Sequence, residues 1–585
     1  MNNVDELSVL RHTASHILAQ AVLRLFPNTK LAIGPSIDTG FYYDFDSEVS
    51  FTNEDLEKIE AEMKKIVKEN LKVERFELPR AEALELMKDQ PYKIELINDL
   101  PEGETISFYK QGEFTDLCAG PHLPYTAKVK AFKLLSVTGA YWRGNEKNKM
   151  LQRIYATAFK TKDELNEFLA QQEEARKRDH NKLGRELEIF TTVDYIGQGL
   201  PIMLPKGTAM IQTLQRFVED VETTKGWLRT KTPLMAKSDL YKISGHWDHY
   251  QDGMFVMGDE ETDKEVFALR PMTCPFQYQA YLNKMRSYRD LPLRYAETST
   301  LFRNEASGEM HGLIRVRQFT ISEGHLMCTP EQLEDEFKNC LELAIYMLKT
   351  LGLYEDVSYR FSQWDPEDRE KYIGTEEQWN EAQGMMEKIL NHLEIPYKVG
   401  VGEAAFYGPK LDIQIKNVFG KEDTLITIQI DQMLAEKFGM EYTDKDGSKK
   451  NPYIIHRTSI GCYERTLALL IEKYAGAFPV WLAPVQVKVI PISEKQADKA
   501  QEIKDKLVAA KIRVGADLRN EKLGYKIRQA QMEKIPYMLV IGEKEIENNV
   551  VAVRTREGGD MGTMSLDDFI HQVNVTDSVY NIKID

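Results

Sequence analysis

The pattern of strand-forming residues between positions 188 and 482 constrains the fold of this 585-residue chain more than any other feature. Runs rich in β-branched and aromatic residues occupy positions 316–327, 410–419 and 424–432, and a helical stretch at 330–351 follows the first run. These strands lack the regular alternation with helices that marks repeated βαβ units. We therefore expect a large antiparallel sheet in a domain that spans residues 188–482.

The flanking segments have different patterns, so the chain is predicted to be a multidomain α+β protein. Residues 1–160 combine two amphipathic helical stretches with short strands, which is typical of an α+β domain. Residues 161–187 are highly charged and predict a single connecting helix. Residues 483–585 alternate strand and helix at short spacing, after a linker with two prolines, and this predicts an α/β domain.

The composition excludes several classes of protein. With 42% hydrophobic and 29% charged residues, the chain is not a disordered protein, a collagen-like fibre or a disulfide-stapled scaffold. No run of about 18 apolar residues occurs, so we expect no membrane span. The first residues lack the features of a signal peptide and the five cysteines are scattered, so we expect a cytoplasmic protein. A net charge of −16 argues against a protein that coats nucleic acid, but it does not exclude a specific nucleic-acid partner.

One stretch, TSTLFRNEASGEMHGLIRVRQFTISEGH at positions 298–325, carries residues suited to a nucleotide. Arg303 and Glu305 precede a loop rich in Gly, Ser and His, and Arg315 and Phe319 follow on the returning strand. Arginine forks suit phosphates, and an aromatic ring suits a stacked purine. Since neither the P-loop nor the dinucleotide-binding fingerprint is present, a nucleotide site here is of another type.

Two further elements complete this pattern. Arg465 lies just inside a helix that follows a glycine turn in HRTSIGCYERTLALLIEKYAG, and Pro233 marks a helix-to-strand junction in TKTPLMAKSDLYKISGHW. With the first stretch, they resemble motifs 2, 3 and 1 of the class II aminoacyl-tRNA synthetases. The contexts of Cys274, His325 and His456 narrow the resemblance to the bacterial threonyl-tRNA synthetases, in which one Cys and two His at these positions hold a zinc ion. The spacing of these three residues matches no local zinc rule.

The resemblance covers essentially the whole chain and implies its domain functions. It implies an editing domain at 1–160, a connecting helix at 161–187, a class II catalytic domain at 188–482 and an anticodon-binding domain at 483–585. Many members of the family carry a small N-terminal ubiquitin-like (TGS) domain, which we expect to be absent because this chain starts at the editing domain. The partners implied are ATP, L-threonine, tRNA(Thr) and a second copy of the chain. The homodimer would use motif 1 around Pro233.

A zinc ion with three protein ligands has a physical logic for threonine. Its open coordination positions can accept the amino nitrogen and the hydroxyl of threonine, and valine has no hydroxyl to offer. Losing such a polar contact in a site built for it is worth ~10⁴-fold or more in discrimination. Serine lacks only a methyl group, which gives ~1–3 kcal/mol of rejection. An enzyme of this design therefore needs a second, hydrolytic site.

The N-terminal segment supplies two motifs for that hydrolytic site, H-x-x-x-H and C-x-x-x-H. Their four side chains could bind a second zinc ion, or they could line a metal-free hydrolytic pocket. The resemblance to the editing domain of the bacterial threonyl enzymes implies the metal-free pocket, which would hydrolyse mischarged seryl-tRNA(Thr). The predicted editing residues are His12, His16, Lys93, Asp116, Cys118 and His122.

The resemblance also implies how ATP is bound. The carboxylate of threonine attacks the α-phosphate, so the phosphate charge must be neutralised and the reactants aligned. Arg303 would contact the α-phosphate, Arg315 and Arg465 the distal phosphates, and Glu305 the adenine amino group, while Phe319 would stack on the adenine. Mg²⁺ would bridge phosphate oxygens.

The remaining predicted residues concern the amino acid and the tRNA. Lys410 would contact the amino acid and the adenylate, and His246 is a candidate participant in transfer to the tRNA. The predicted amino-acid-binding residues are Glu323, Tyr407, Gln429 and Cys462. The predicted anticodon-binding residues are Asn520, Glu545 and Arg554, and unpaired bases read along their edges are the usual mode for single-stranded RNA.

Some positions depart from the usual bacterial pattern. The sequence Q-D-D-A-H of the family is replaced by I-S-E-G-H, which ends at His325. Glu323 can still accept a hydrogen bond from the substrate hydroxyl, but from a longer side chain. Thr273 replaces an expected Asn, and Cys462 replaces a small Ser. These changes leave the zinc ligands intact and bear on the fine geometry of amino-acid recognition.

Two alternatives to a threonine–tRNA ligase stay open at the level of sequence. A catalytically silent synthetase-like RNA-binding protein would have lost Arg303, Arg465 or the zinc ligands, and all of these are present. A class II ligase for proline or serine would not need Cys274, His325 and His456 together. ATP–pyrophosphate exchange with each amino acid separates the three hypotheses.

Overall fold

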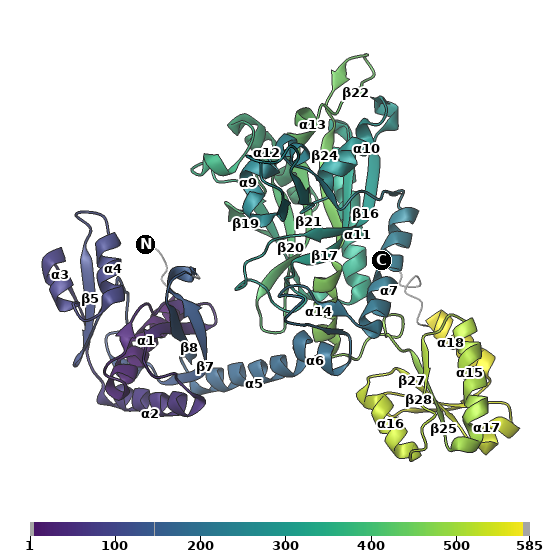
Figure 1. The fold of residues 1–585 in the computed structure, drawn as a ribbon, viewed down its shortest axis with the longest axis horizontal. Coiled ribbons are helices and arrows are strands. Elements are labelled where there is room, and N and C mark those ends of the chain that lie inside the picture. The colour runs from purple at the N-terminus through teal and green to yellow at the C-terminus, as the bar shows by residue number, and fades with distance from the viewer. Residues whose placement is uncertain (1–4, 146, 577–585) are drawn as a thin grey trace. The chain divides into compact units, whose positions relative to one another are not determined.

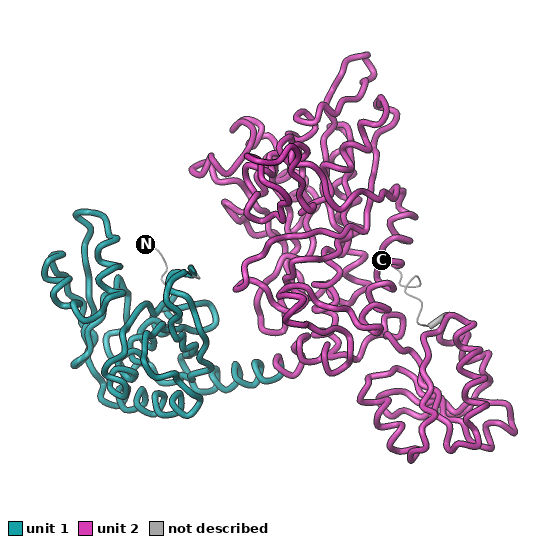
Figure 2. The backbone as a smooth tube through the Cα atoms, viewed as in Figure 1, with its two compact units in different colours: residues 1–174 teal, residues 175–585 magenta. Residues whose placement is uncertain are grey.

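The structure is a computed structural model that describes residues 5–145 and 147–576. The chain forms two compact units, Met1–Glu174 and Ala175–Asp585 (Figure 2). The point of division falls inside the segment predicted as a connector.

The first unit is built around an antiparallel sheet with the strand order β1-β3-β8-β7, and β2 pairs with the first two residues of β3. Two long helices pack with this sheet. The second has one apolar face that includes Ile59 and Met63, whereas the first is buried on nearly all sides between Leu10 and Val22. A smaller sheet, β4-β5-β6, carries two short helices. The elements are α1 (Glu6–Leu25), β1 (Lys30–Leu31), β2 (Ser36–Ile37), β3 (Gly40–Asp46), α2 (Asn53–Glu69), β4 (Val73–Leu78), α3 (Arg80–Leu86), α4 (Pro91–Asp99), β5 (Ile106–Gln111), β6 (Phe114–Leu117), β7 (Ala131–Tyr141) and β8 (Met150–Phe159).

The connector contains two helices, whereas the sequence predicted one. They are α5 (Lys162–Arg178) and α6 (His180–Glu186). The break occurs at Asp179, whose backbone leaves the helical region and whose carboxylate accepts a hydrogen bond from the amide of Asn181 at 2.7 Å. An aspartate in this position satisfies a free amide at the start of a new helix, and this favours a restart over continuation.

The second unit contains the predicted large sheet, and its antiparallel character is confirmed. Its strand order is β11-β16-β17-β24-β21-β20-β18-β19, and only the pairs β11–β16 and β18–β19 are parallel among the described strands of this sheet (Figure 1). The strands are β11 (Leu228–Arg229), β16 (Leu293–Phe302), β17 (Gln318–Cys328), β18 (Val357–Gln363), β19 (Tyr397–Val401), β20 (Lys410–Lys416), β21 (Glu422–Asp431) and β24 (Tyr453–Cys462).

One face of this sheet is covered by helices and the other carries polar side chains. The largest core cluster of the molecule includes Phe217 and Leu214 of α7, Phe337 and Met347 of α11, and Leu467 of α14. The helices of this region are α7 (Pro205–Thr224), α8 (Ser238–Ser244), α9 (His246–Tyr250), α10 (Cys274–Leu282), α11 (Leu333–Leu351), α12 (Glu376–His392), α13 (Leu434–Lys437) and α14 (Tyr463–Tyr474). Short strands complete it: β9 (Phe190–Thr191), β10 (Ile202–Met203), β12 (Met235–Lys237), β13 (Val256–Met257), β14 (Phe267–Leu269), β15 (Arg286–Ser287), β22 (Tyr442–Thr443) and β23 (Lys449–Lys450).

The C-terminal part of the second unit has the predicted alternation of strands and helices. Its sheet has the order β26-β25-β27-β28-β29, with parallel pairing around β25 and antiparallel pairing of the last two strands. The elements are β25 (Val487–Pro491), α15 (Ala497–Ala509), β26 (Val514–Ala516), α16 (Leu523–Met532), β27 (Tyr537–Ile541), α17 (Glu543–Glu547), β28 (Val551–Thr555), β29 (Asp560–Met564) and α18 (Leu566–Thr576).

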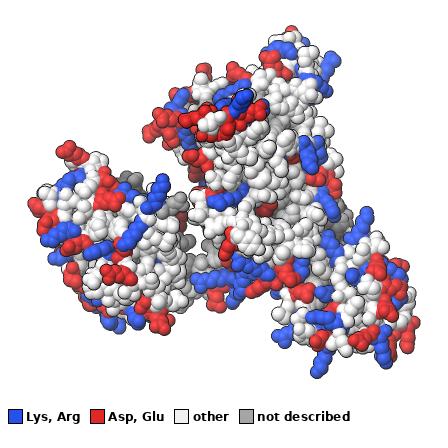
Figure 3. Space-filling model, in the orientation of Figure 1, with Lys and Arg blue, Asp and Glu red and all other residues white. Residues whose placement is uncertain are grey.

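The surface charges of both signs are interspersed. Figure 3 shows blue and red side chains mixed over the visible face, with a broad area in the middle of the second unit that carries few charges. None of the described helices is both long and apolar enough to cross a membrane.

Candidate functional site

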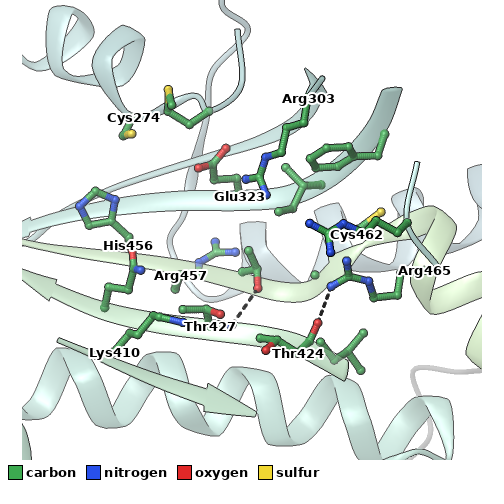
Figure 4. A pocket seen from close by; sticks show the side chains of 18 of the residues that line it. Cys274, Arg303, Glu323, Lys410, Thr424, Thr427, His456, Arg457, Cys462 and Arg465 are labelled. Atoms are coloured by element: carbon green, nitrogen blue, oxygen red, sulfur yellow. Dashed lines mark hydrogen bonds between the residues drawn. The ribbon is translucent and has the colours of Figure 1, made fainter. Parts of the chain in front are cut away.

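A cavity of about 340 Å³ lies on the polar face of the large sheet. Figure 4 shows that Cys274 and His456 lie at one end of it and Arg465 and Cys462 at the other, with Arg303 and Glu323 between them. The predicted residues that line it are Cys274, Arg303, Glu305, Arg315, Phe319, Glu323, Tyr407, Lys410, Gln429, His456, Cys462 and Arg465. The structure therefore brings together residues that are spread over almost 200 positions of the sequence.

Strand register creates one row of polar side chains across four strands. His325 of β17 stands opposite His456 of β24, His456 opposite Gln429 of β21, and Gln429 opposite Lys410 of β20. Because neighbours at matched register point to the same face of a sheet, these side chains face one region. Cys274, the first residue of α10, approaches the row from above the sheet in Figure 4.

The potential ligand atoms of Cys274, His325 and His456, here named the Cys274 cluster, lie within 4.8 Å of one another and all three residues are buried. His325 Nδ1 lies 2.6 Å from the amide oxygen of Gln277, so Nδ1 carries the hydrogen and Nε2 has a free lone pair. Nε2 is buried without a hydrogen-bond partner among the described residues. The donor set therefore fits a zinc ion, since ligating histidines usually donate their other ring hydrogen to an acceptor.

Burial also shapes the charge states of the Cys274 cluster. It raises the pKa of the Cys274 thiol and lowers the pKa of His325, so both groups are driven toward their neutral forms. A buried cation reverses this preference for the thiol, because a coordinating thiol is deprotonated. His456 Nε2 lies 3.0 Å from the carboxylate of Asp431, which also accepts hydrogen bonds from the amides of Met433 and Leu434.

The opposite end of the cavity is rich in arginine. The Arg303 guanidinium lies 5.2 Å from the centre of the Phe319 ring. Arg315 is paired with Glu305 at 2.8 Å. Arg465 Nε donates to the carbonyl of Ile314 at 2.9 Å, and a second nitrogen of Arg465 donates to the carbonyl of Thr424 (Figure 4). These cations lie around a space next to an aromatic ring, which is an arrangement suited to a nucleotide with several phosphates.

The middle of the cavity contains groups that can bind an amino acid. The Tyr407 hydroxyl donates to the amide oxygen of Gln429 at 3.0 Å, and Lys410 is paired with Asp412. Glu323 Oε2 is buried without a hydrogen-bond partner among the described residues, and burial raises the pKa of this carboxyl group. Cys462, which was also predicted to bind the amino acid, lies instead at the arginine-rich end beside Arg465 and donates its thiol hydrogen to Glu464.

His246 lies outside this lining. Its ring packs against Phe406 and Tyr407, with ring centres at 4.8 and 6.0 Å. Its Nδ1 lies 2.8 Å from the hydroxyl of Ser244, and burial lowers the pKa of His246 to about 3. The imidazole is therefore neutral near pH 7, and it contacts the cavity through Tyr407.

The predicted editing residues also come together, in the first unit. The potential ligand atoms of four of them, here named the His12 cluster (His12, His16, Cys118 and His122), lie within 4.8 Å of one another. Cys118 Sγ lies 3.3 Å from His12 Nε2 and 3.2 Å from His122 Nε2. Burial raises the pKa of Cys118 to about 11 and lowers the pKa values of the three histidines. At neutral pH the cluster consists of a thiol and neutral imidazoles.

A buried charged group borders the His12 cluster. Lys93 Nζ lies 2.7 Å from Asp116 Oδ1, and His16 Nε2 lies 3.7 Å from Asp116 Oδ2. The hydroxyl of Tyr43 donates to Asp116 Oδ2 at 2.5 Å and lies 3.1 Å from Lys93 Nζ. The Lys93 ammonium neutralises the Asp116 carboxylate, which is therefore less able to favour a cation at the His12 cluster.

Sequence reasoning missed three residues of these sites: Tyr43, Gln277 and Asp431. Tyr43 lies in the strand-like run GFYYDF, where an inward position could have been assigned from the alternation of side chains. Gln277 lies one helical turn after Cys274, on the same side of α10, which is a recognisable spacing. Asp431 faces His456 only because of strand register, and no local signal in the sequence indicates this contact.

The predicted anticodon-binding residues lie on three elements of the C-terminal sheet domain. Asn520 is exposed in the segment before α16, Glu545 lies in α17, and Arg554 lies in β28. The Glu545 carboxylate accepts a hydrogen bond from the amide of Gly542 at 2.9 Å. Arg554 lies 3.9 Å from the carboxylate of Asp560.

Family comparisons agree with this organisation. Residues 255–474 match the tRNA synthetase class II core domain (G, H, P, S and T), and residues 486–575 match an anticodon binding domain. Residues 106–155 match the threonyl and alanyl tRNA synthetase second additional domain.

Among solved structures, the chain is similar to the RNA binding domain of threonyl-tRNA synthetase from Cryptosporidium parvum, with a TM-score of 0.64 and 33% identity over 68% of this chain and 98% of that one. It is also similar to putative threonyl-tRNA synthetase ThrRS-1 from Aeropyrum pernix, with a TM-score of 0.58 and 26% identity over 68% of this chain and 95% of that one.

Curated relatives match over almost the whole chain. A threonine–tRNA ligase from Clostridium perfringens is 67% identical over 562 residues, which are 96% of this chain and 87% of that protein. A threonine–tRNA ligase from Geobacillus is 50% identical over 569 residues, which are 97% of this chain and 88% of that protein. The resemblance drawn from the motifs is thereby confirmed, and the chain belongs to the threonine–tRNA ligase family of class II aminoacyl-tRNA synthetases.

Proposed function

We propose that this chain activates L-threonine with ATP, transfers it to the 3′ end of tRNA(Thr) and hydrolyses mischarged seryl-tRNA(Thr). The observation that carries the proposal is a single cavity on the sheet with Cys274 and His456 at one end, His325 buried beside them, and the arginine-rich end opposite. A threonine and an ATP bound at the two ends would meet in the middle, which supplies the alignment that adenylate formation requires.

Cys274, His325 and His456 would hold a zinc ion, which supplies a Lewis acid with open positions for the amino and hydroxyl groups of threonine. Gln277 keeps His325 in the tautomer with Nε2 free. Glu323, Tyr407 and Gln429 would surround the amino acid, whereas Cys462 lies at the other end of the cavity. The unpartnered oxygen of Glu323 is available to accept a hydrogen bond from the substrate.

The positive charges of the cavity neutralise the phosphates. Arg303 would contact the α-phosphate, and Arg315 and Arg465 the distal phosphates, while Mg²⁺ bound with ATP would supply further positive charge. Glu305 would bind the adenine amino group and Phe319 would stack on the adenine. Because Arg315 is paired with Glu305 in the structure, ATP binding exchanges this pair for contacts to the nucleotide.

Lys410 would help to hold the adenylate through its place in the cross-strand row. His246 would act on transfer to the tRNA through its contact with Tyr407. Since burial lowers the pKa of His246 to about 3, the neutral imidazole would position the acceptor end of the tRNA and would not act as a general base.

The His12 cluster would be the hydrolytic site for seryl-tRNA. Neutral imidazoles can accept a proton from water, and the thiol of Cys118 is not activated as a nucleophile because its pKa is raised. Lys93 and Asp116 would place charge near the ester. Discrimination against threonine would be steric, through its additional methyl group.

Three further proposals concern assembly, RNA and location. A homodimer would use the segment around Pro233, and the exposed apolar side chains of Leu228, Leu234 and Met235 support an interface there.

Asn520, Glu545 and Arg554 would read the threonine anticodon. The reducing environment indicated by the scattered free cysteines supports a cytoplasmic location.

The test is ATP–pyrophosphate exchange with threonine, serine and proline, together with a metal analysis of the purified chain. We expect the strongest exchange with threonine, weaker exchange with serine, none with proline, and one zinc per chain. Exchange driven by proline, or none with any of the three, would contradict the proposal. For the anticodon, an Arg554→Ala variant that charges wild-type and anticodon-mutant tRNA as well as the parent would exclude that role.

A further inference from the structure

One buried histidine belongs to neither of the sites described above. His180, the first residue of α6, is 0% exposed. Its Nδ1 lies 2.7 Å from the carboxylate of Glu472 in α14, and its Nε2 lies 3.2 Å from the backbone nitrogen of Leu313. A single ring thus connects the connector, the helix that carries Arg465, and the loop that carries Arg315.

The two contacts define the tautomer of His180. The backbone N–H of Leu313 can only donate, so Nε2 must accept, and the ring hydrogen lies on Nδ1, from which it is donated to Glu472. Asp179, His180 and Glu472 place potential ligand atoms within 4.8 Å of one another. Both ring nitrogens are nevertheless committed to protein partners, so a metal site is not the best account of this group.

The loop turn from His311 to Arg315 is built against this ring. His311 and Arg315 form an isolated antiparallel bridge that closes the turn. Gly312 has a positive φ of 50°, and a Cβ atom at this position would lie 2.2 Å from His180 Nε2. Only glycine allows the backbone to approach the ring so closely. Leu313 then enters the main hydrophobic core with 0% exposure.

The same turn is held from its other side by Arg465, which donates to the carbonyl of Ile314 at 2.9 Å. Arg315 follows directly and lines the cavity. The second oxygen of Glu472 accepts a hydrogen bond from the amide of Val418 at 3.2 Å, so Glu472 is itself held in place. Glu472 therefore fixes the orientation of the His180 ring, and His180 in turn fixes the turn at residues 311–315 through its hydrogen bond to Leu313. This turn carries Arg315 and contacts Arg465.

We propose that His180 is a positioning residue for ATP: through Leu313 it holds the 311–315 turn, and with it the backbone of Arg315 and the Ile314 carbonyl that Arg465 contacts, in place before ATP arrives. This inference rests on the proposed function of the cavity. A turn that is already ordered lowers the entropy cost of binding ATP. Loss of the contact between His180 and Leu313 should therefore weaken the binding of ATP more than the binding of threonine.

Two substitutions separate the two contacts of the ring. Asparagine places an amide nitrogen near the position of Nδ1, so His180→Asn can keep the bond to Glu472 but loses the acceptor for Leu313. Glutamine places an amide oxygen near the position of Nε2, so His180→Gln can keep the acceptor for Leu313. His392→Asn is the matched control, because it makes the same change in an exposed histidine that is paired with Glu334.

The experiment measures threonine-dependent ATP–pyrophosphate exchange by the full chain and hydrogen–deuterium exchange of peptides covering residues 311–315. For His180→Asn we expect KM for ATP to rise roughly tenfold, KM for threonine to stay within about twofold, and the loop peptide to exchange faster. His180→Gln should largely restore both readouts, and His392→Asn should match the parent.

Two results would overturn the inference: parental KM for ATP and parental loop protection in His180→Asn, or equal damage in the Asn and Gln variants. If the unmodified chain supports no threonine-dependent exchange, the proposed function fails instead. The hydrogen-exchange comparison of the two variants still decides in that case whether His180 holds the turn.

Discussion

The Cys274 cluster and the His12 cluster have similar chemical compositions, yet their surroundings differ. Each consists of one cysteine with histidines, and in each the potential ligand atoms lie within 4.8 Å of one another. The outer polar neighbours of the Cys274 cluster are acceptors, the amide oxygen of Gln277 and the carboxylate of Asp431. The outer neighbours of the His12 cluster are an ion pair, the Asp116 carboxylate and the Lys93 ammonium.

This difference teaches that ligand-capable side chains do not by themselves define a metal site. Acceptors around the first cluster orient the imidazoles for a cation, whereas the carboxylate beside the second, Asp116, is already neutralised by Lys93. In the second cluster the thiol already has hydrogen-bond partners within the protein, since Cys118 Sγ lies within hydrogen-bond distance of His12, His122 and the amide of Gly120. The difference supports the proposal that zinc binds at the Cys274 cluster and that the His12 cluster acts in proton transfer.

The largest expected effect comes from replacing the thiol of each cluster in turn. Cys274→Ser should lose its zinc and lower threonine activation by roughly 10⁴-fold, because amino-acid recognition by a dedicated polar site is lost. Cys118→Ser is the matched control and should keep one zinc per chain and normal activation. Metal analysis and pyrophosphate exchange check both variants, and tRNA binding should stay measurable in each. Normal threonine activation by the metal-depleted Cys274→Ser variant would contradict the zinc site at the Cys274 cluster. Two zinc ions per unmodified chain would contradict a metal-free His12 cluster.

The next largest effect concerns the hydrolytic role of the His12 cluster. The His12→Ala/His16→Ala double variant should deacylate pre-charged seryl-tRNA about 10²- to 10⁴-fold more slowly, since general acid–base catalysis typically contributes that much. Its threonine activation and zinc content should not change. Deacylation of seryl-tRNA and threonyl-tRNA is measured side by side. The assignment fails if the double variant matches the parent, or if the parent hydrolyses threonyl-tRNA as fast as seryl-tRNA.

A smaller effect is expected from the neighbours that orient the ligands. Gln277→Leu removes the acceptor for His325 Nδ1 and should lower zinc affinity by about 10- to 100-fold, as measured by competition with a chelator. Gln277→Glu keeps an acceptor oxygen at this position and should retain zinc better than the leucine variant. Equal zinc retention by both variants would show that the acceptor does not matter.

The extent to which these sites follow from the sequence depends on how local their signals are. The H-x-x-x-H and C-x-x-x-H spacings and the arginine-bearing loop were readable because each is contiguous in the chain, and the antiparallel sheet followed from strand composition. The pairing of His325 with His456, and the contact of His456 with Asp431, depend on register between strands far apart in the sequence. The break of the connector at Asp179 had a local signal, since its carboxylate caps the amide of Asn181, and it was overlooked. The contacts of His180 could not be predicted because Glu472 and Leu313 are far from it in the sequence.

The smallest expected effect is the response of the His12 cluster to acid. Burial holds the pKa values of His12, His16 and His122 below the ordinary value of 6.5, so these imidazoles bind protons more readily in the unfolded chain. Their contribution to stability is then complete above pH 6.5 and declines as the pH falls toward the folded-state values. Each such histidine can cost up to about 1.4 kcal/mol per pH unit in this window.

Protection of α1 peptides from hydrogen exchange, corrected for the intrinsic rate at each pH, measures this loss in the intact chain. We expect protection to fall between pH 6.5 and 5 in the parent, and to fall less steeply in the His12→Ala/His16→Ala variant, which lacks two of the three groups. A zinc ion in this cluster would compete with protons for the same nitrogens, so added zinc would then shift the acid response. A metal-free cluster requires that zinc has no effect on the protection of α1 and that protection falls less steeply with pH in the variant. Equal pH dependence of protection in parent and variant would contradict the role of burial.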